Sequence, residues 1–573
     1  MSFVGEIKRR KVFQVAAVYA VVAWVLVQIV ATIEEPLNLP EWFDTFVIVS
    51  LGIGFPIALI LSWAFDVTPE GVVRDTGDSP QPGGRTIEFV LLGLVTIAFG
   101  ALLYREFRPE AGPPPGSIAV LPFENLSPDP DNAFFADGIH DDLLTELGRI
   151  RSLNTISRSS VLAYRNTTKT MPQIGAELSV AYVVTATVSR AGDAFRINAQ
   201  LHDVETNQII WSQPYDENLT ARDVFTIRSE IATQIATAVE ATLSAEDRQR
   251  LAEFPTSNLD SLLTYFRARF ELERRSSQSI QRSIELFNEA IELDQNYAQA
   301  HAGLADAYMV LSEYSPDADR VTAREESRGA AAKAYELNPE LPEALISLAW
   351  SRMIHDYEWE AAEALFREAH SIEPRNIAAL HWLSHLLSWK GDNNEAVEFA
   401  QRAANLEPTA AMRTNLSYIN MDAGNFGLAI EQGNEVIREF PDFRSIHRIL
   451  FVTQMRAGYY EEGAVNMVHW AESTQRDVAA AEEIGRRIVA SRTKGEPADL
   501  DDELISRLNA GLQTLPQIYA FAGDADATLE TLARAIDERA GSRSALSIRI
   551  NPAYDFVRED PRFAELERRA GFE

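Results

Sequence analysis

The sequence predicts a multidomain protein with N-terminal transmembrane helices, a central α+β domain and a C-terminal all-α solenoid of helical repeats. Three observations lead to this fold class. Long apolar stretches fill the first 105 residues, strand-like and helix-like patterns alternate from 117 to 250, and a unit near 34 residues recurs in the C-terminal half. Because 573 residues exceed what one ordinary core accommodates, several folding units are expected.

Composition and charge exclude several classes of function. The chain has 52 Lys and Arg against 84 Asp and Glu, which gives a net charge of −32. A chain this acidic repels nucleic acid at long range, so no nucleic-acid partner is expected. The sequence contains no cysteine, which excludes disulfide bonds, thiolate nucleophiles and cysteine-ligated zinc.

Three apolar stretches predict a membrane anchor over residues 1–108. They cover 12–33, 45–65 and 87–104, and a bilayer-spanning helix needs about 20 apolar residues. A cleaved signal peptide is the alternative for the first stretch, but its apolar region is too long and no small-residue cleavage site follows it. The sequence therefore predicts an integral membrane protein.

The basic residues around these stretches predict the orientation of the anchor. Lys8, Arg9, Arg10 and Lys11 precede the first stretch, whereas the connector 34–44 has neither Lys nor Arg. These charges place the N-terminus in the cytoplasm and, after three spans, the C-terminal domains in the periplasm of a bacterial inner membrane. If the third stretch does not insert, the C-terminal domains are cytoplasmic instead.

Residues 117–250, which follow a Pro-rich linker at 109–116, combine strand and helix patterns. A buried strand is expected at 117–122, followed by an amphipathic helix at 132–150. Further elements are predicted as a short strand at 153–156, a helix at 171–178, strands at 181–190, 194–203 and 208–215, and a helix at 221–246. One sheet with several helices is an α+β arrangement.

Three stretches of this region resemble the TolB amino-terminal-like domain of bacterial signalling proteins. They are IAVLPFENLSPDPDNAFFADGIHDDLLTELGRI at 118–150, ISRSSVLAYRN at 156–166, and the segment from IGAELSV to SQPYD at 174–216. The resemblance implies a domain that joins an N-terminal effector, commonly a winged-helix or nucleotide-cyclase domain, to C-terminal repeats. Here apolar stretches occupy the effector position, so the resemblance does not imply transcriptional or cyclase activity for this chain.

The region 257–573 has the spacing of tetratricopeptide repeats (TPR). Pro339, Pro374, Pro408 and Pro441 are 35, 34 and 33 residues apart, and each ends a helical phrase. One helix hairpin of this length cannot bury its apolar face alone, so the hairpins are expected to stack. Residues 560–573 look like the closing cap of such an array.

No constellation of catalytic or metal-binding residues is evident. Asp129, Asp131, Asp137, Asp141 and Asp142 do not follow a calcium-loop pattern, and Asp141 and Asp142 are expected on the solvent side of their helix. His381 and His385 share a helix face, but Trp382 stands where a zinc hydrolase needs Glu. We therefore expect neither an enzyme, nor a cofactor, nor a metal.

The concave face of a repeat solenoid is its usual partner surface, and the first helix of each hairpin lines it. A protein or peptide partner is accordingly expected there, although each aromatic could equally fill the core between repeats. The favoured hypothesis is a membrane-anchored adaptor; the alternative is a sensor or regulatory component of a bacterial signalling pathway, with a ligand at the α+β domain. The oligomeric state stays open. The candidate partner-binding residues are Tyr308, Trp350, Trp382, His385, Asn415 and Tyr418.

Overall fold

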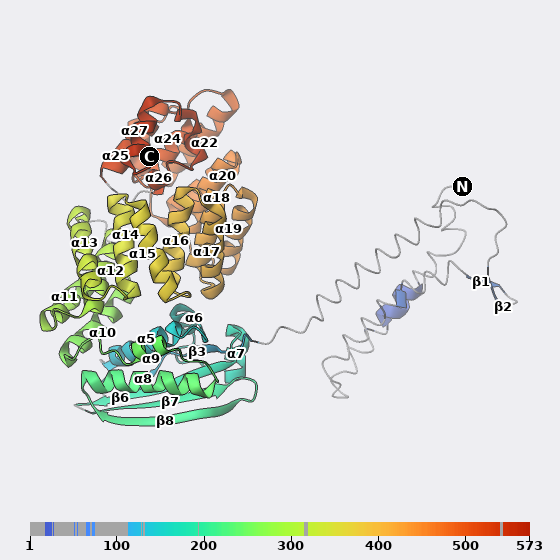
Figure 1. Cartoon of the computed structure of the whole chain (residues 1–573). Helices are drawn as coiled ribbons and strands as arrows, with labels where there is room; N and C mark the ends of the chain where they lie inside the picture. Colours follow the sequence, from blue (N-terminus) through green and yellow to red (C-terminus); the bar gives the residue numbers. More distant parts are fainter. Residues whose placement is uncertain are drawn as a thin grey trace. The chain divides into compact units, whose positions relative to one another are not determined.

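The chain divides into two units, Met1–Pro109 and Glu110–Glu573 (Figure 1). The computed structural model describes residues 113–572, apart from 128, 130–131, 193, 315–318 and 539–542. In the N-terminal unit it describes 18–25, 27, 51, 54–55, 65–68 and 71–74.

The N-terminal unit contradicts the prediction of transmembrane helices. Within the described part of the chain, no helix combines the length and the apolar character that crossing a bilayer requires. Residues 18–25 are helical, and the end of the expected span 45–65 belongs to a strand, β1 (Phe65–Thr68), which pairs with β2 (Gly71–Arg74). An apolar composition is necessary for a span but not sufficient, because a continuous helix is also required.

The inner-membrane localisation depended on those spans and is therefore wrong as well. Most of 12–33 and 45–65, and all of 87–104, lie outside the described residues.

The second unit begins with a mixed sheet of strand order β5-β3-β6-β7-β8, in which β4 also pairs with β6. Strand β3 runs parallel to β5 and β6, whereas β6, β7 and β8 form an antiparallel meander. Buried and accessible residues alternate along β7, as expected when one face of a sheet is covered. The strands are β3 (Ser117–Val120), β4 (Glu124–Asn125), β5 (Asn154–Thr155), β6 (Tyr182–Ala191), β7 (Ala194–Asp203) and β8 (Gln208–Asn218).

Two helices, α5 and α8, lie on the side of this sheet that faces the solenoid (Figure 1). The helix expected at 221–246 is in fact two helices, because Glu240 adopts φ +57° and a capping box at Ser244 starts a new one. The helices of this region are α5 (Ala133–Arg149), α6 (Arg158–Leu162), α7 (Met171–Leu178), α8 (Ala221–Ala238) and α9 (Ala245–Leu251).

The remainder of the unit is a series of helix hairpins, a TPR-type fold. Gly391, Gly424 and Gly458 adopt φ values of +97°, +80° and +83° at turns between paired helices, a conformation that glycine adopts readily. The helices of the regular array are α10 (Leu259–Glu273), α11 (Ser277–Leu293), α12 (Ala298–Tyr314), α13 (Arg320–Leu337), α14 (Pro342–Ser351) with the π-helical extension η2 (Arg352–Asp356), α15 (Trp359–Ile372), α16 (Ile377–Lys390), α17 (Asn393–Leu406), α18 (Ala410–Asp422), α19 (Phe426–Glu439), α20 (Ile446–Arg456) and α21 (Tyr460–Ser473).

The C-terminal segment folds back onto the middle of the array. Trp359 at the start of α15 donates a hydrogen bond from Nε1 to the Ala570 carbonyl at 2.9 Å, and its ring stacks on Phe572 at 4.7 Å. Residues more than 200 positions apart thus share one core. The segment comprises α22 (Val478–Lys494), α23 (Asp502–Leu508), α24 (Leu515–Ala522), α25 (Ala525–Asp537), α26 (Arg543–Leu546), η3 (Pro552–Val557) and α27 (Pro561–Arg569).

Helix α5 contains a matched pair of glycines that tests how the sheet domain packs on the solenoid. A Cβ at Gly138 would overlap the buried ring of Phe266 in α10, whereas a Cβ at Gly148 would meet nothing within 4 Å. We expect Gly138→Ala to lower the free energy of unfolding by about 1–3 kcal/mol through overpacking. We expect Gly148→Ala to raise it by about 0.5–1 kcal/mol through helix propensity.

Urea unfolding of the two single variants measures both effects. Equal changes in the free energy of unfolding for Gly138→Ala and Gly148→Ala would show that α5 and α10 are not packed as described.

Candidate functional site

A charged surface of α5 faces the solenoid and forms the junction between the two regions. The opposite side of α5 buries Phe135, Ile139 and Leu143 beneath the sheet. Because the helix period is 3.6 residues, Asp142, Glu146 and Arg149, which are four and three positions apart, share the remaining face. Helix α5 thereby presents both signs of charge to the repeats.

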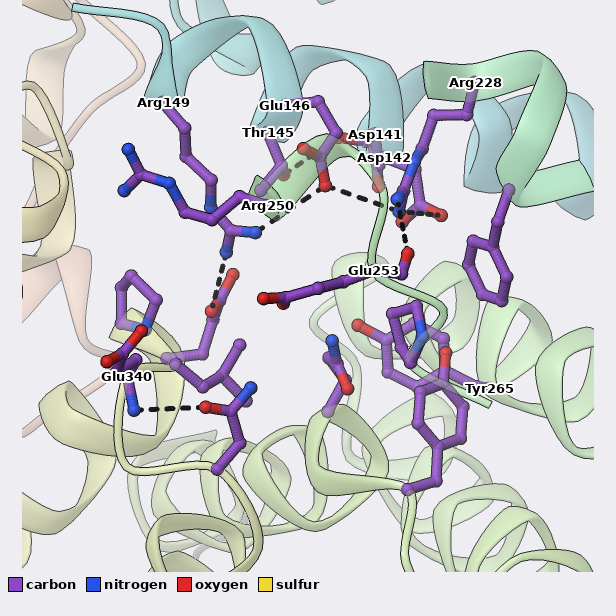
Figure 2. A pocket seen from close by; sticks show the side chains of 18 of the residues that line it. Asp141, Asp142, Thr145, Glu146, Arg149, Arg228, Arg250, Glu253, Tyr265 and Glu340 are labelled. Atoms are coloured by element: carbon purple, nitrogen blue, oxygen red, sulfur yellow. Dashed lines mark hydrogen bonds and ion pairs between the residues drawn. The ribbon is translucent and has the colours of Figure 1, made fainter. Parts of the chain in front are cut away.

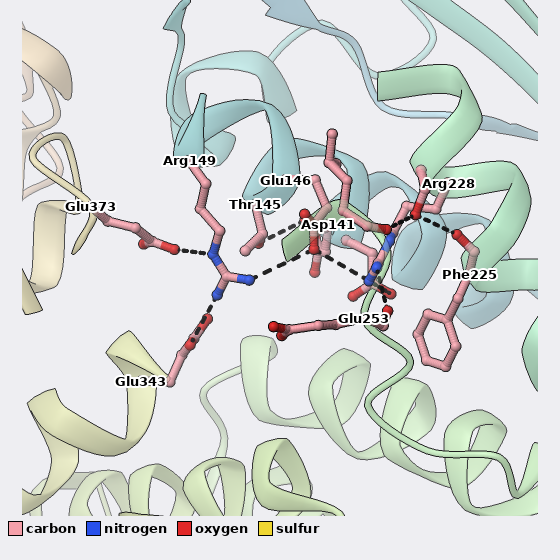
Figure 3. A network of polar contacts seen from close by, with 12 residues as sticks. Asp141, Thr145, Glu146, Arg149, Phe225, Arg228, Glu253, Glu343 and Glu373 are labelled. Atoms are coloured by element: carbon pink, nitrogen blue, oxygen red, sulfur yellow. Dashed lines mark hydrogen bonds and ion pairs between the residues drawn. The ribbon is translucent and has the colours of Figure 1, made fainter. Parts of the chain in front are cut away.

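Arg149 is the centre of this junction. Its guanidinium forms an ion pair and a hydrogen bond with Glu373, at the end of α15, and lies 3.5 Å from Oε2 of Glu343 in α14. It also lies 3.6 Å from Oε1 of Glu146 on its own helix. The Arg149 side chain is only 16% exposed, and it joins two carboxylates from one repeat to a carboxylate of the α+β domain (Figure 3).

A second arginine extends the network into the α+β domain. Arg228 of α8 lies 3.4 Å from Oε1 of Glu146 and 3.9 Å from Oδ2 of Asp142. Its Nη2 donates to the Glu253 carbonyl at 3.4 Å. Arg228 and Glu146 are both 5% exposed, so this pair is shielded from solvent.

A third group of charges is centred on Asp141. Its carboxylate pairs with Arg158 of α6 and lies 3.8 Å from Arg269 of α10. Burial raises the pKa of Asp141, but His140, Arg158 and Arg269 outweigh burial, and the net shift is downward. The sequence-based expectation that Asp141 and Asp142 face solvent was wrong, because α8 and α10 pack over this side of α5.

These side chains enclose a polar cavity of about 80 Å³ (Figure 2). It is large enough for several water molecules or a small polar ligand. Its charged and polar lining includes Asp141, Asp142, Glu146, Arg149, Arg228, Arg250, Glu253, Tyr265, Arg269, Gln299, Asn338, Glu340 and Glu343.

Burial controls protonation in this cavity. It raises the pKa of Asp142 to about 7, opposed by Arg228 and assisted by Glu146 and Asp141. Burial also raises the pKa of Glu343, against the effect of Arg149. Across the described residues no three His, Asp or Glu side chains are grouped to hold a metal ion. The charged and polar lining of the cavity suits a small polar ligand or water.

The structure brings together most of the partner-binding residues expected from the sequence. Trp350 of α14 and Trp382 of α16 have ring centroids 6.2 Å apart, and His385 lies 5.8 Å from Trp382 and 5.1 Å from Tyr418 of α18. Asn415 of α18 donates to Ser384 at 3.3 Å. We call Trp350, Trp382, His385 and Tyr418 the ring row.

The residues of the ring row differ in exposure. Trp382 is half-buried, whereas Trp350, His385, Asn415 and Tyr418 are all buried. Tyr308 of α12 stands apart, because its hydroxyl interacts with Asn288 and Glu326 on the neighbouring second helices. Trp382 is consequently the candidate with the most accessible ring in the row.

The sequence alone did not identify the junction residues. A stripe of charge at positions 142, 146 and 149 is typical of a solvated helix face, and the arginines that match it come from elements far along the chain. A usable signal was that Arg228 and Arg269 lie on apolar helix faces, between Val224 and Ile231 in α8 and between Tyr265 and Leu272 in α10, where an unpaired charge would be costly.

No family model matches the chain. It is 30% identical over 259 residues to "Putative adenylate cyclase 3" of Rhizobium meliloti (strain 1021), a match that covers 43% of this chain and 43% of that protein. It is 25% identical over 165 residues to "Transcriptional regulator HilA" of Salmonella typhimurium, covering 29% of each. The chain thus spans less than half the length of these curated relatives.

Several solved structures are similar in fold. PilW, a type IV pilus biogenesis factor, has 17% identity and a TM-score of 0.28, covering 42% of this chain and 92% of PilW. YrrB, a TPR protein with an unusual peptide-binding site, has 18% identity and a TM-score of 0.25, covering 34% and 97%. Yeast Tom70 has 13% identity and a TM-score of 0.32, covering 60% and 82%.

The raised pKa of Asp142 predicts a pH dependence of stability. A carboxyl whose pKa is higher in the folded state than in the unfolded chain stabilises the fold at low pH, and this contribution is lost as pH rises through the folded value. The stability contribution of Asp142 is therefore lost between pH 3.8, the ordinary pKa of an aspartate, and about pH 7, its pKa in the folded protein. Asp142→Asn keeps a neutral group at this position, so the variant should gain stability relative to the wild type as pH rises from 4 to 7.

Urea unfolding at pH 4.5, 6 and 7.5 measures this difference. Asp216→Asn, at an exposed ion pair on β8, is the matched control. A pH-independent difference between Asp142→Asn and the wild type would contradict the raised pKa.

Proposed function

We propose that this chain is a non-enzymatic scaffold that binds a protein partner through its TPR solenoid. In this proposal the α+β region is a TolB amino-terminal-like domain that is held against the first repeats. The array from α10 onward supplies the binding surface, and the charged junction fixes the direction in which the α+β domain points.

The observation that carries this proposal is the ring row. Three successive first helices, α14, α16 and α18, each contribute aromatic rings, and these rings contact one another from repeat to repeat. Aromatic side chains are enriched at the energetic centres of protein interfaces, because they bury much surface with few rotatable bonds. In this row Trp382 provides the accessible anchor for a partner, and the buried rings of Trp350, His385 and Tyr418 hold it in position.

The named relatives support a binding module rather than one chemistry. One is described as a putative adenylate cyclase and the other as a transcriptional regulator, and each shares less than half its length with this chain. A region shared by proteins with different named activities suits recruitment or regulation. The junction charges also pair with one another, as Arg149 does with Glu373 and Arg228 with Glu146, which favours a structural role over catalysis.

A photocrosslinking side chain placed at position 382 of the full-length protein tests the proposal in cells. We expect a discrete adduct at position 382 and none at position 459, where the exposed Tyr459 lies at the start of an outer helix. The adduct identifies the partner. Trp382→Ala should then weaken binding of that partner by about tenfold or more, as for a central interface aromatic.

The thermal unfolding temperature of Trp382→Ala must be recorded as a control for folding. Identical adducts at positions 382 and 459, or unchanged affinity in a folded Trp382→Ala variant, would overturn the assignment of the binding surface.

A sensor is the second candidate function, and the junction cavity is the observation that favours it. A small polar ligand in this cavity would contact both the α+β domain and α14, so its binding would change how firmly the two regions are joined. A metabolite that raises the unfolding temperature of the wild type but not of Arg228→Leu, without altering the adduct at position 382, would support the sensor instead of the scaffold.

A further inference from the structure

Two arginines from distant parts of the chain lie near Tyr418 of the ring row. Arg543 of α26 lies over the ring of Tyr418, with its guanidinium carbon 5.0 Å from the ring centroid. Arg448 lies in the first turn of α20, within electrostatic range of both Arg543 and Tyr418. The C-terminal segment that folds back onto the array therefore brings a second positive charge to the first.

Neither arginine has an acidic partner among the residues that the structure describes. No carboxylate of the described chain lies within 4 Å of either guanidinium. The acidic group that acts on Tyr418, Asp422, is already paired with Arg456 at 2.6 Å, and both of those side chains are fully buried. Burial, together with the like charge of Arg543, lowers the pKa of Arg448 to about 10.

A buried histidine completes the cluster. His385 is 1% exposed, and neither of its ring nitrogens makes a hydrogen bond of normal geometry with a described residue, although the Asn415 side chain lies close enough to interact with the ring. Burial, His381 and Arg543 hold the pKa of His385 well below its usual value, so the ring is neutral and offers one N–H donor. His381, 4.9 Å away, also leaves its Nδ1 without a described partner.

These observations point to one missing component, a negative charge. Two arginines within electrostatic range of each other repel, a nearby anion relieves this repulsion, and the cost of leaving it unrelieved rises as their surroundings lose water. The N-terminus of α20 adds positive potential in the same place.

We propose that Arg448, Arg543 and His385 form a binding site for a small oxyanion, of the phosphate or carboxylate class, between the solenoid and its C-terminal segment. The guanidinium groups supply paired N–H donors that match the geometry of an oxyanion. A small anion suits the site better than a protein side chain does, because His385 and Tyr418 are buried between the repeats and α26.

The site joins two segments, so its ligand would stabilise the folded-back arrangement. Arg543 belongs to the C-terminal segment, whereas Arg448 and His385 belong to the array. An anion that contacts both holds α26 against Tyr418 and thereby supports the ring row from behind. Anion binding would in this way strengthen the ring row, to which its ligand His385 belongs.

The test uses the full chain and three salts at matched ionic strength: sodium phosphate, sodium acetate and sodium chloride. We expect phosphate or acetate to raise the unfolding temperature of the wild type above its value in chloride. Isothermal titration calorimetry with inorganic phosphate should show saturable binding. Binding should weaken by about tenfold or more in Arg543→Gln and in Arg448→Gln, because each removes a charge-assisted contact.

Arg549→Gln is the matched control, since Arg549 lies on the same C-terminal segment but is exposed. It should keep the response of the wild type. In chloride alone, Arg448→Gln should be at least as stable as the wild type, because it removes the repulsion from Arg543. A purely structural role for these arginines predicts the opposite, a loss of stability that no anion restores.

A response to phosphate alone would identify a phosphate ligand, and a response to acetate as well would identify a carboxylate ligand. The proposal would be overturned if all three salts gave the wild type the same unfolding temperature, or if Arg543→Gln and Arg549→Gln bound phosphate equally well. If the glutamine variants do not fold, Arg543→Lys and Arg448→Lys, which keep the positive charge, replace them in the test. Phosphate binding that is retained but weaker in these lysine variants supports the site, and unchanged phosphate binding contradicts it.

Discussion

The arrangement of the second unit depends on the charges gathered around Arg149. This arginine is the last residue of α5, and it contacts carboxylates of α14 and the end of α15 as well as Glu146 of its own helix. Ion pairs removed from water gain little net stability, because the lost hydration offsets the attraction. They do discriminate strongly between orientations, because any other docking would leave buried charges unpaired. The junction therefore determines how the α+β domain sits on the repeats.

Two other contacts limit the freedom of the solenoid. Phe266 of α10 packs against Gly138 of α5, so apolar contacts reinforce the charged junction at the first repeat. In the middle of the array, Trp359 bonds to Ala570 and stacks on Phe572, which ties the C-terminus to the third hairpin. A TPR array held by the α+β domain and by its own C-terminus presents its inner helices in one fixed geometry. This is the property that a scaffold needs, because a preformed surface loses less entropy when it binds.

Much of the fold could be predicted from the sequence, for local reasons. The spacing of Pro339, Pro374, Pro408 and Pro441 indicated stacked hairpins, and the alternation at 181–190 and 194–203 indicated strands that the structure places at 182–191 and 194–203. The break between α8 and α9 was missed, because it depends on one residue, Glu240, with positive φ. The predicted transmembrane helices were wrong, because apolar length does not establish a continuous helix.

The site was predictable only in part. Ring positions on the first helices followed from the repeat period, and the structure groups Trp350, Trp382, His385 and Tyr418 accordingly. Tyr308 does not join them, because its hydroxyl turns toward the second helices. The junction around Arg149 and the Arg448–Arg543 pair involve residues about 95 to 225 positions apart in the chain. The sequence alone does not show that residues so far apart lie close together in space.

The cooperativity of unfolding tests the central claim most directly. Calorimetry of the full-length protein should show the α+β domain and the first repeats unfolding together in the wild type. Arg149→Ala leaves three carboxylates without their shared partner and should cost about 3–5 kcal/mol at the junction. Its unfolding should therefore split into two transitions. Arg282→Ala, at an exposed pair on α11, should behave like the wild type. A single unchanged transition in Arg149→Ala would contradict the claim that this junction joins the two regions.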